Sequence, residues 1–214
     1  MHTIFITGSD TGIGKTYVVA AVARLFTKTM LKIQLVKPIE TGRDSGEPGD
    51  AEHAARLSDI AETDVFTLFR FREPLAPLAA AEQEGKPLSL SLLLDRFQEL
   101  PSADLRIVEG AGGIAVPLDP DGRDWSDFAK EIGADRTILV IADRLGAINQ
   151  ARLTLAYACA KNLRSGIWLN EISPQSPEIR ESNQSSLAES IWATQHFGEQ
   201  IPENPETTIR HLSR

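Results

Sequence analysis

The sequence has little of three residue types that carry specialised chemistry. Cys159 is its single cysteine, so the chain forms no internal disulfide, which suits a reducing compartment. This cysteine falls in the apolar helical stretch 153–160, where we expect a small core residue rather than a nucleophile. The four histidines show no metal-ligand spacing, and with one cysteine this argues against a zinc site. The three tryptophans are scattered, which is typical of core packing rather than of base stacking.

Long apolar runs and excess positive charge are also missing. No apolar run reaches the length of a membrane span, and Met1 leads directly into a predicted strand with no signal peptide. The formal net charge is −8, which argues against nucleic acid and anionic membranes as main partners. We therefore expect a soluble, cytoplasmic protein with no nucleic-acid partner and no membrane partner.

Apolar segments alternate with amphipathic segments along the chain. This alternation predicts an α/β fold of three layers, with a mainly parallel sheet flanked by helices. The predicted strands are 3–7, 32–37, 105–109, 137–142 and 165–169. The predicted helices are 15–27, 51–57, 90–99, 125–132, 148–162 and 184–194. No linker or repeat divides the sequence, so we expect a single domain over residues 1–214.

The most specific motif spans residues 8–16, which read Gly-Ser-Asp-Thr-Gly-Ile-Gly-Lys-Thr. It lies between a predicted strand and a predicted helix, the context of a phosphate-binding loop (P-loop). Its glycines let backbone N–H groups turn toward an anion, and the start of the helix adds a positive dipole end. Lys15 would then reach the terminal phosphates, and the Thr16 hydroxyl would hold Mg²⁺. The alternative is a glycine-rich turn that merely packs.

Two further residues lie inside this loop. Asp10 is expected to brace it through side chain–backbone hydrogen bonds. Thr11 has two open interpretations, because its hydroxyl could brace the loop or contact a substrate beside the nucleotide.

A second motif, Val-Lys-Pro-Ile-Glu-Thr-Gly, spans residues 36–42. Lys37 ends a predicted buried strand, where its charge is costly unless it meets an anion. A γ-phosphate would serve, with Lys15 on its other side, and such electrostatic stabilisation is most of what phosphoryl transfer requires. A lysine that only extends its amine to solvent is the alternative.

A third motif, Val-Glu-Gly-Ala-Gly-Gly, spans residues 108–113. Glu109 ends a strand predicted to lie beside the first one, and it could bind Mg²⁺ directly or through water. The glycines after it permit close approach of a ligand. Asp50 is a second candidate metal carboxylate, with an ordinary helix N-cap as its alternative.

Together with Leu-Gly-Ala-Ile-Asn at residues 145–149 and Asn170, these motifs resemble the dethiobiotin synthetase family. The resemblance covers most of the chain and implies a P-loop NTPase fold. It also implies ATP-dependent closure of a ureido ring on 7,8-diaminopelargonate, with CO₂ or bicarbonate as the carbon source and Mg²⁺ as cofactor. A carbamate and a carbamic–phosphoric anhydride would be the intermediates, and this chemistry needs no covalent nucleophile.

The resemblance also implies roles for individual residues. Lys37 would be the main catalytic cation, assisted by Lys15. The metal would bind Thr16, Asp50 and Glu109. The nucleotide would contact Gly12, Ile13, Gly14, Lys15, Thr16, Tyr17, Asp50, Glu109, Gly110, Ala111, Gly112 and Asn170, the last as reader of adenine. The diamine would contact Thr11, Lys37 and Thr41, and its carboxylate would meet Leu145, Gly146 and Asn149 of a second subunit in a homodimer.

The chain departs from the family pattern at two places. Many members carry Glu where this chain has Gly12, and the tail at residues 198–204 only partly follows the family's nucleotide-binding ending. Two relatives of the same superfamily are alternatives. An amidotransferase-type ligase would normally carry a glutaminase domain with a reactive cysteine, and a partitioning ATPase usually has a lysine where this chain has Ser9. A catalytically silent nucleotide sensor is the alternative from another class of protein.

Overall fold

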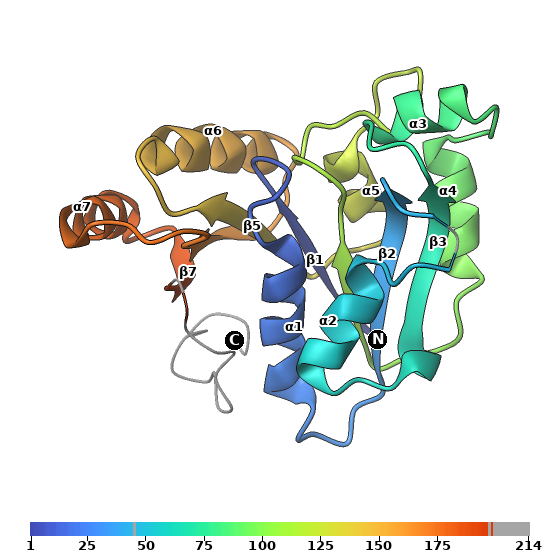
Figure 1. Cartoon of the computed structure of the whole chain (residues 1–214), viewed down its shortest axis with the longest axis horizontal. Coiled ribbons are helices and arrows are strands. Elements are labelled where there is room, and N and C mark those ends of the chain that lie inside the picture. Colours follow the sequence, from blue (N-terminus) through green and yellow to red (C-terminus); the bar gives the residue numbers. More distant parts are fainter. Residues whose placement is uncertain (45, 197, 199–214) are drawn as a thin grey trace.

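A computed structural model describes residues 1–44, 46–196 and 198, which form one seven-stranded sheet flanked by helices (Figure 1). Every pairing in the sheet is parallel, in the order β3-β2-β4-β1-β5-β6-β7. The strands are β1 (His2–Gly8), β2 (Ile33–Thr41), β3 (Val65–Phe71), β4 (Leu105–Glu109), β5 (Arg136–Ala142), β6 (Ser165–Asn170) and β7 (Ile191–Gln195). The helices are α1 (Lys15–Phe26), α2 (Asp50–Ser58), α3 (Pro77–Gln83), α4 (Leu90–Gln98), α5 (Trp125–Glu131), α6 (Ala147–Ala160) and α7 (Pro177–Leu187), with a short 3₁₀ turn at Glu62–Asp64. The expected α/β fold is confirmed.

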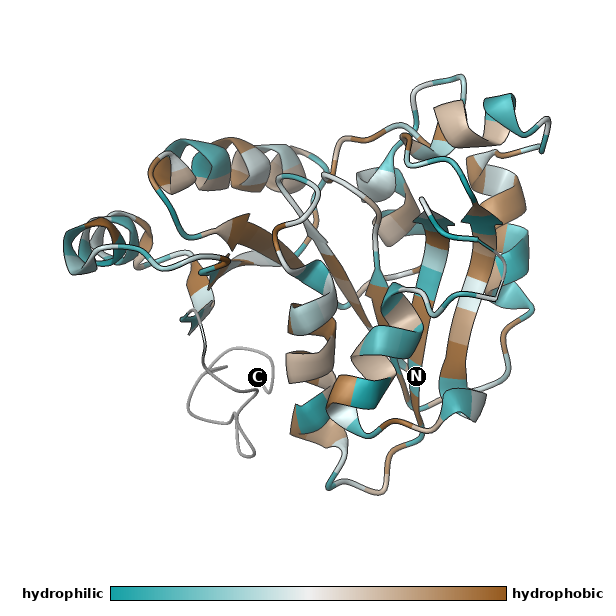
Figure 2. Ribbon diagram, in the orientation of Figure 1, coloured by the Kyte–Doolittle hydropathy of each residue, from teal (hydrophilic) through white to brown (hydrophobic). Residues whose placement is uncertain are grey.

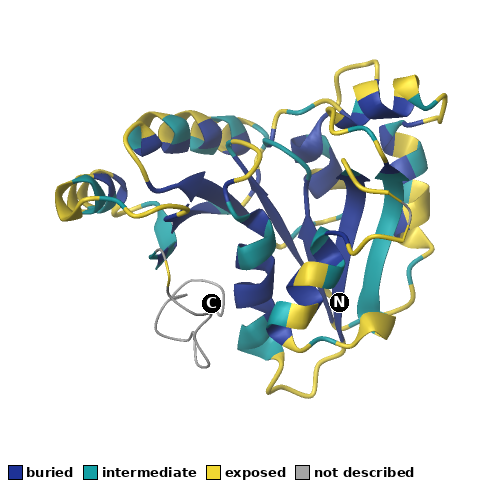
Figure 3. Cartoon of the chain, viewed as in Figure 1, coloured by how far each residue is buried: buried dark blue, intermediate teal, exposed yellow. Residues whose placement is uncertain are grey.

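Alternation along the central strands gives the sheet two apolar faces. In β1, Ile4 and Ile6 belong to the core cluster that includes residues of α1 and α2, whereas Phe5 between them belongs to the cluster on the other face, where it contacts Trp125 and Phe128 of α5. Figure 2 shows the resulting brown central strands, and Figure 3 shows that they are buried. Trp125 and Trp168 are 0% and 1% exposed, so both belong to the core as expected.

Two strands and one helix were not predicted. β3 lies at one edge of the sheet, with six half-buried residues out of seven, and β7 lies at the other edge. The predicted helix 184–194 is wrong beyond Leu187, because residues 191–195 pair with β6 as β7. α3 begins at Pro77, a position where the missing N–H costs no helical hydrogen bond.

The second strand is longer than predicted. β2 continues through Pro38 to Thr41, whereas its pairing with β4 ends at Val36. Beyond that point β2 is paired only with β3, and proline is tolerated where one side of a strand is free. Lys37 therefore lies inside the strand rather than at its end.

The prediction for Cys159 is wrong. Its side chain is exposed, because the buried side of α6 is formed by Ala147, Ala151, Thr154 and Ala158. Cys159 follows Ala158 and is rotated away from that side. The divergent tail named above lies outside the described residues, apart from Gly198. Within the described part, no helix has both the length and the apolar character needed to cross a membrane.

Candidate active site

The carboxyl ends of the central strands open into one cavity of about 710 Å³, which we call the P-loop cavity. Parallel sheets bind ligands at this edge, because the loops after the strands meet there. The cavity is lined by residues of all three motifs, by the start of α2 and by the loop before α3. They are Thr11, Gly12, Gly14, Lys15, Thr16, Lys37, Glu40, Thr41, Gly42, Arg43, Asp50, Pro74, Leu75, Ala76, Pro77, Glu109, Ala111, Gly112 and Val116.

The first wall of the cavity is the P-loop between β1 and α1. Gly12 and Gly14 have φ angles of 71° and 83°, which residues with a side chain rarely adopt. The loop is braced from within, since Asp10 Oδ1 accepts from the N–H of Thr11 at 2.7 Å. Lys15 Nζ donates to the carbonyl of Asp10 at 2.7 Å. The expected bracing role of Asp10 is confirmed.

Lys37 forms the centre of a buried charge cluster. Its Nζ lies 2.7 Å from Asp50 Oδ2 and 2.7 Å from Glu109 Oε1, and Lys37 is 3% exposed. Burial alone would lower the pKa of Lys37, but the charges of Glu109 and Asp50 outweigh it and raise that pKa above its ordinary value. Lys37 therefore stays protonated, and it does not extend into solvent as the alternative interpretation held.

Lys15 is in the opposite electrostatic situation. Burial, with the nearby positive charge of Lys37, lowers the pKa of Lys15 to about 8. Lys15 is the first residue of α1 and Lys37 lies within β2, yet both line the same cavity. A polyanion between them would meet two cations, and the carboxylates of Glu40, Asp50 and Glu109 line the same cavity.

Glu109 and Thr16 provide oxygen atoms beside these cations. Thr16 Oγ1 donates to Glu109 Oε1 at 3.2 Å, and Glu109 Oε2 is buried with no hydrogen-bond partner among the described residues. Burial raises the pKa of Glu109, against the attraction of Lys37. Asp50 differs, because the attraction of Lys37 overcomes its burial and lowers its pKa. Asp50 is the first residue of α2, after Gly49 at the N-cap, so the N-cap interpretation is wrong.

Glu40 is a member of the site that the sequence analysis did not assign. It is 3% exposed, lines the cavity and accepts from the N–H of Asp50 at 2.8 Å. Burial raises its pKa. The second motif contained this residue, but a strand ending at Lys37 left Glu40 in a loop of unknown direction.

The remaining predicted residues fall into two groups. Thr11 and Thr41 line the P-loop cavity, as do Ala111 and Gly112, with Gly110 buried beneath them. Tyr17 is half-buried on α1, and Asn170 is buried with its amide on the P-loop carbonyl of Ile13.

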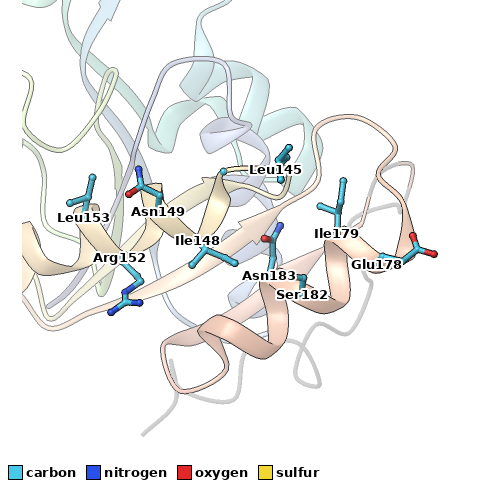
Figure 4. A pocket seen from close by; sticks show the side chains of 10 residues that line it. Leu145, Ile148, Asn149, Arg152, Leu153, Glu178, Ile179, Ser182 and Asn183 are labelled. Carbon is cyan, nitrogen blue, oxygen red and sulfur yellow. The ribbon is translucent and has the colours of Figure 1, made fainter.

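Leu145, Gly146 and Asn149 do not share this cavity. They line a separate hollow of about 660 Å³, which we call the α6–α7 groove. Figure 4 shows its two sides, with Ile148 on α6 and Asn183 on α7. Leu145 is 84% exposed at its rim. One chain alone thus keeps these three predicted residues apart from Lys15 and Lys37.

The chemistry available in the P-loop cavity is that of phosphate binding and transfer. A glycine loop at a helix start, two ammonium groups, three carboxylates and three threonine side chains surround one space. The described residues contain no group of three or more His, Cys, Asp and Glu side chains that could hold a metal alone. Mg²⁺ commonly binds through one or two carboxylates together with substrate phosphates and water, so this composition is compatible with it.

Comparisons with known proteins identify the family. A family model described as an AAA domain matches residues 2–210. The ATP-dependent dethiobiotin synthetase BioD of Bacillus licheniformis is 32% identical, over 99% of this chain and 92% of its own length. The enzyme of the same name from Mycobacterium marinum is 37% identical, over 88% of this chain and 83% of its own length. This chain belongs to the dethiobiotin synthetase family.

Membership confirms the resemblance and the expected enzyme class, a ligase-type enzyme. The solved structure of a ParA family ATPase from Chlorobium tepidum superposes with a TM-score of 0.55 at 14% identity, over 92% of this chain and 85% of that one. At that identity the likeness concerns the fold alone. The likeness confirms the P-loop NTPase fold of this dethiobiotin synthetase family member. It gives no support to the alternative that the chain is a partitioning ATPase.

Proposed function

We propose that this protein, as a single domain over residues 1–214, makes dethiobiotin from 7,8-diaminopelargonate, CO₂ and ATP in biotin biosynthesis. The observation that carries the proposal is the convergence of Lys15, at the start of α1, and Lys37, within β2, on one cavity bounded by Asp50 and Glu109. Two cations facing one space suit a migrating phosphoryl group. The reaction is that of the family's named members, and a cytoplasmic location is part of the proposal.

The proposed reaction proceeds in three steps. One amine of the substrate adds to CO₂ and loses a proton, which gives a carbamate. A carbamate oxygen then attacks the γ-phosphorus of ATP and ADP leaves, which gives a carbamic–phosphoric anhydride. Finally the second amine attacks the anhydride carbonyl, loses a proton and expels phosphate, which closes the ureido ring.

The P-loop and the two lysines would act on the phosphates. Backbone N–H groups of residues 12–17 and 109–112 would contact the triphosphate, with Asn170 on the adenine. Lys37 would stabilise the charge that develops on the transferred group, and Lys15 would assist. Lys37 suits the larger role because its raised pKa keeps it charged throughout the physiological range. Each such group is worth about a hundredfold or more in rate.

The residues present fit a magnesium ion. Within the part of the chain that the structure describes, Glu109 Oε2 is a buried carboxylate oxygen without a hydrogen-bond partner, and the Thr16 hydroxyl lies beside the same carboxylate. Thr16, Asp50 and Glu109 would hold the ion, directly or through water. When bound, it would offset phosphate charge and orient the γ-phosphate. Lys37 now forms ion pairs with both carboxylates, so it would exchange these partners for the nucleotide.

The diamine would bind beside the γ-phosphate. Thr11 and Thr41 are the hydroxyl-bearing candidates for contacting the diamine. They come from the first and the second motif and line the same cavity. The substrate's apolar chain and carboxylate would reach the α6–α7 groove of a second subunit, at Leu145, Gly146 and Asn149. The exposed apolar rim of that groove supports a homodimer with the active site at its interface.

One assay tests the proposal. Pure protein is incubated with the diamine, ¹³C-bicarbonate and Mg·ATP, and the products are examined by mass spectrometry and for released phosphate. We expect a cyclic urea that carries the label, and phosphate release that requires the diamine and Mg²⁺. No labelled product, with phosphate release indifferent to the diamine, would reject the assignment. Tight nucleotide binding without turnover would favour the silent sensor instead.

A further inference from the structure

Asn170 contacts the P-loop directly, although it comes from the end of β6. Its Nδ2 donates to the carbonyl oxygen of Ile13 at 2.8 Å, and Asn170 is 5% exposed. The Ile13 side chain is 2% exposed and packs in the core beneath the loop. The side chain and the carbonyl of Ile13 are therefore both fixed.

The contact with Ile13 also fixes an N–H that lines the P-loop cavity. The carbonyl of Ile13 and the N–H of Gly14 belong to one trans peptide, so they point in opposite directions. With the carbonyl held toward Asn170, the N–H of Gly14 is turned the other way. Gly14 lines the P-loop cavity, and within the described part of the chain no protein acceptor bonds this N–H.

Gly14 is also the residue that makes the contact sterically possible. A Cβ at this position would lie 2.2 Å from Asn170 Nδ2, far inside van der Waals contact. Its φ of 83° gives a second, independent reason for glycine. The loop and the asparagine thus fit one another closely.

Asn170 itself is held by rigid neighbours. Its carbonyl accepts from the N–H of Asp143 at 2.8 Å, and its backbone pairs with Gln195 of β7. The next residue, Glu171, has a side chain that is 0% exposed, and it accepts from the N–H of Gln175 at 2.6 Å and pairs with Arg180 at 3.0 Å. Asn170 can fix the position of the Ile13 carbonyl only if its own backbone is held in place, and these contacts hold it.

We infer that Asn170 is a positioning residue for the P-loop, which holds the Ile13–Gly14 peptide so that the Gly14 N–H faces the phosphates. The inference rests on the proposed nucleotide site and adds a role distinct from reading the base. The two roles are compatible, because one Nδ2 hydrogen meets Ile13 while the other hydrogen and Oδ1 have no partner among the described residues and could meet a base.

Tripolyphosphate separates the two roles, because it has phosphates and no base. The experiment compares binding of Mg·tripolyphosphate and of Mg·ATP by calorimetry to the unchanged protein and to Asn170→Ala. We expect tripolyphosphate to bind Asn170→Ala roughly threefold to tenfold more weakly, the scale of one lost hydrogen bond. The loss for Mg·ATP should be at least as large. Equal tripolyphosphate affinity in the two proteins would overturn the inference.

Asn183→Ala is the matched control. Asn183 is an asparagine 4% exposed, and its amide donates to Asp143 Oδ1 at 2.7 Å without touching the P-loop. It should lose thermal stability comparably to Asn170→Ala and keep its tripolyphosphate affinity. A parallel loss of affinity in both variants would also overturn the inference, since it would reflect general destabilisation.

Hydrogen exchange without ligand gives a second readout. These rates give the baseline, and in saturating Mg·tripolyphosphate the Gly14 amide should be protected several-fold less in Asn170→Ala than in the unchanged protein or Asn183→Ala; equal protection would contradict the brace. Dethiobiotin formation by the unchanged protein is scored separately. A failure of that assay rejects the proposed function, whereas unchanged tripolyphosphate binding rejects only the role of Asn170.

Discussion

The P-loop cavity and the α6–α7 groove are similar in volume and opposite in character. In the P-loop cavity, charged side chains are buried and paired within one chain, as Lys37 is with Asp50 and Glu109. At the groove, Leu145 and Leu153 are 84% and 65% exposed. The charges of a buried cluster need their partners within the folded chain itself, because an unpaired buried charge is destabilising. Exposed apolar side chains are tolerated, and they gain free energy when another surface covers them. The charged groups of the first cavity therefore find their partners within one chain, whereas the groove exposes apolar side chains that a second surface could cover.

Removing the central charge of the P-loop cavity should have the largest effect. We expect Lys37→Ala to lower the turnover number by at least about a hundredfold in the labelled-urea assay. The fold should survive, because burial already raises the pKa of Glu109 and lets that carboxyl take up a proton. Lys161→Ala is the matched control, since Lys161 pairs with Asp127 at 2.9 Å on the surface. Near-normal turnover in Lys37→Ala, with unfolding curves like the control's, would remove Lys37 from the mechanism.

The second lysine should make nucleotide binding depend on pH. Lys15 has a pKa of about 8 in the ligand-free protein, so its positive charge is present below that pH and is lost above it. A polyanion binds the charged form better, so the affinity for Mg·ATP should fall above pH 8 by up to about tenfold per pH unit. Calorimetry in buffers of different ionisation enthalpy should detect proton uptake on binding there. Lys15→Arg should lose this dependence, and a flat profile in the unchanged protein would contradict the account.

The smallest effect should come from the groove. We expect Leu145→Ser to raise the KM for the diamine roughly threefold to tenfold and to weaken dimers in sedimentation, with Mg·ATP affinity unchanged. Met30→Ser is the control, because Met30 is likewise a large exposed apolar residue but lines neither cavity. If the two variants behave alike, the groove plays no part in the diamine site.

The sequence predicted the parts of the fold whose signals are local. The strand 105–109 agrees with β4, and the helix 15–27 ends one residue beyond α1. β7 was mistaken for helix because its five residues become a strand only by pairing with β6. β3 was missed although Val-Phe-Thr-Leu-Phe-Arg-Phe is rich in β-branched and aromatic residues, which is a readable strand signal.

The candidate site shows the same division. The glycine loop, Lys37 and Glu109 follow from motif and position, because parallel strands bring their carboxyl ends to one edge. The ion pairs of Lys37 do not, since a sequence cannot give the distance between side chains 13 and 72 residues apart. Glu40 was missed for a related reason, because it depends on β2 continuing past Pro38.

The salt bridges of Lys37 have a thermodynamic consequence for the order of events in the proposed reaction. A nucleotide that binds alone would draw Lys37 away and leave the carboxylates of Asp50 and Glu109 without a positive partner. A divalent ion that binds alone to these carboxylates would leave the Lys37 ammonium group without a negative partner. When the two bind together, Lys37 pairs with the phosphates and the carboxylates pair with the divalent ion, so every charge has a partner of opposite sign. Their affinities should therefore reinforce each other, so that the resting enzyme discriminates against metal-free ATP.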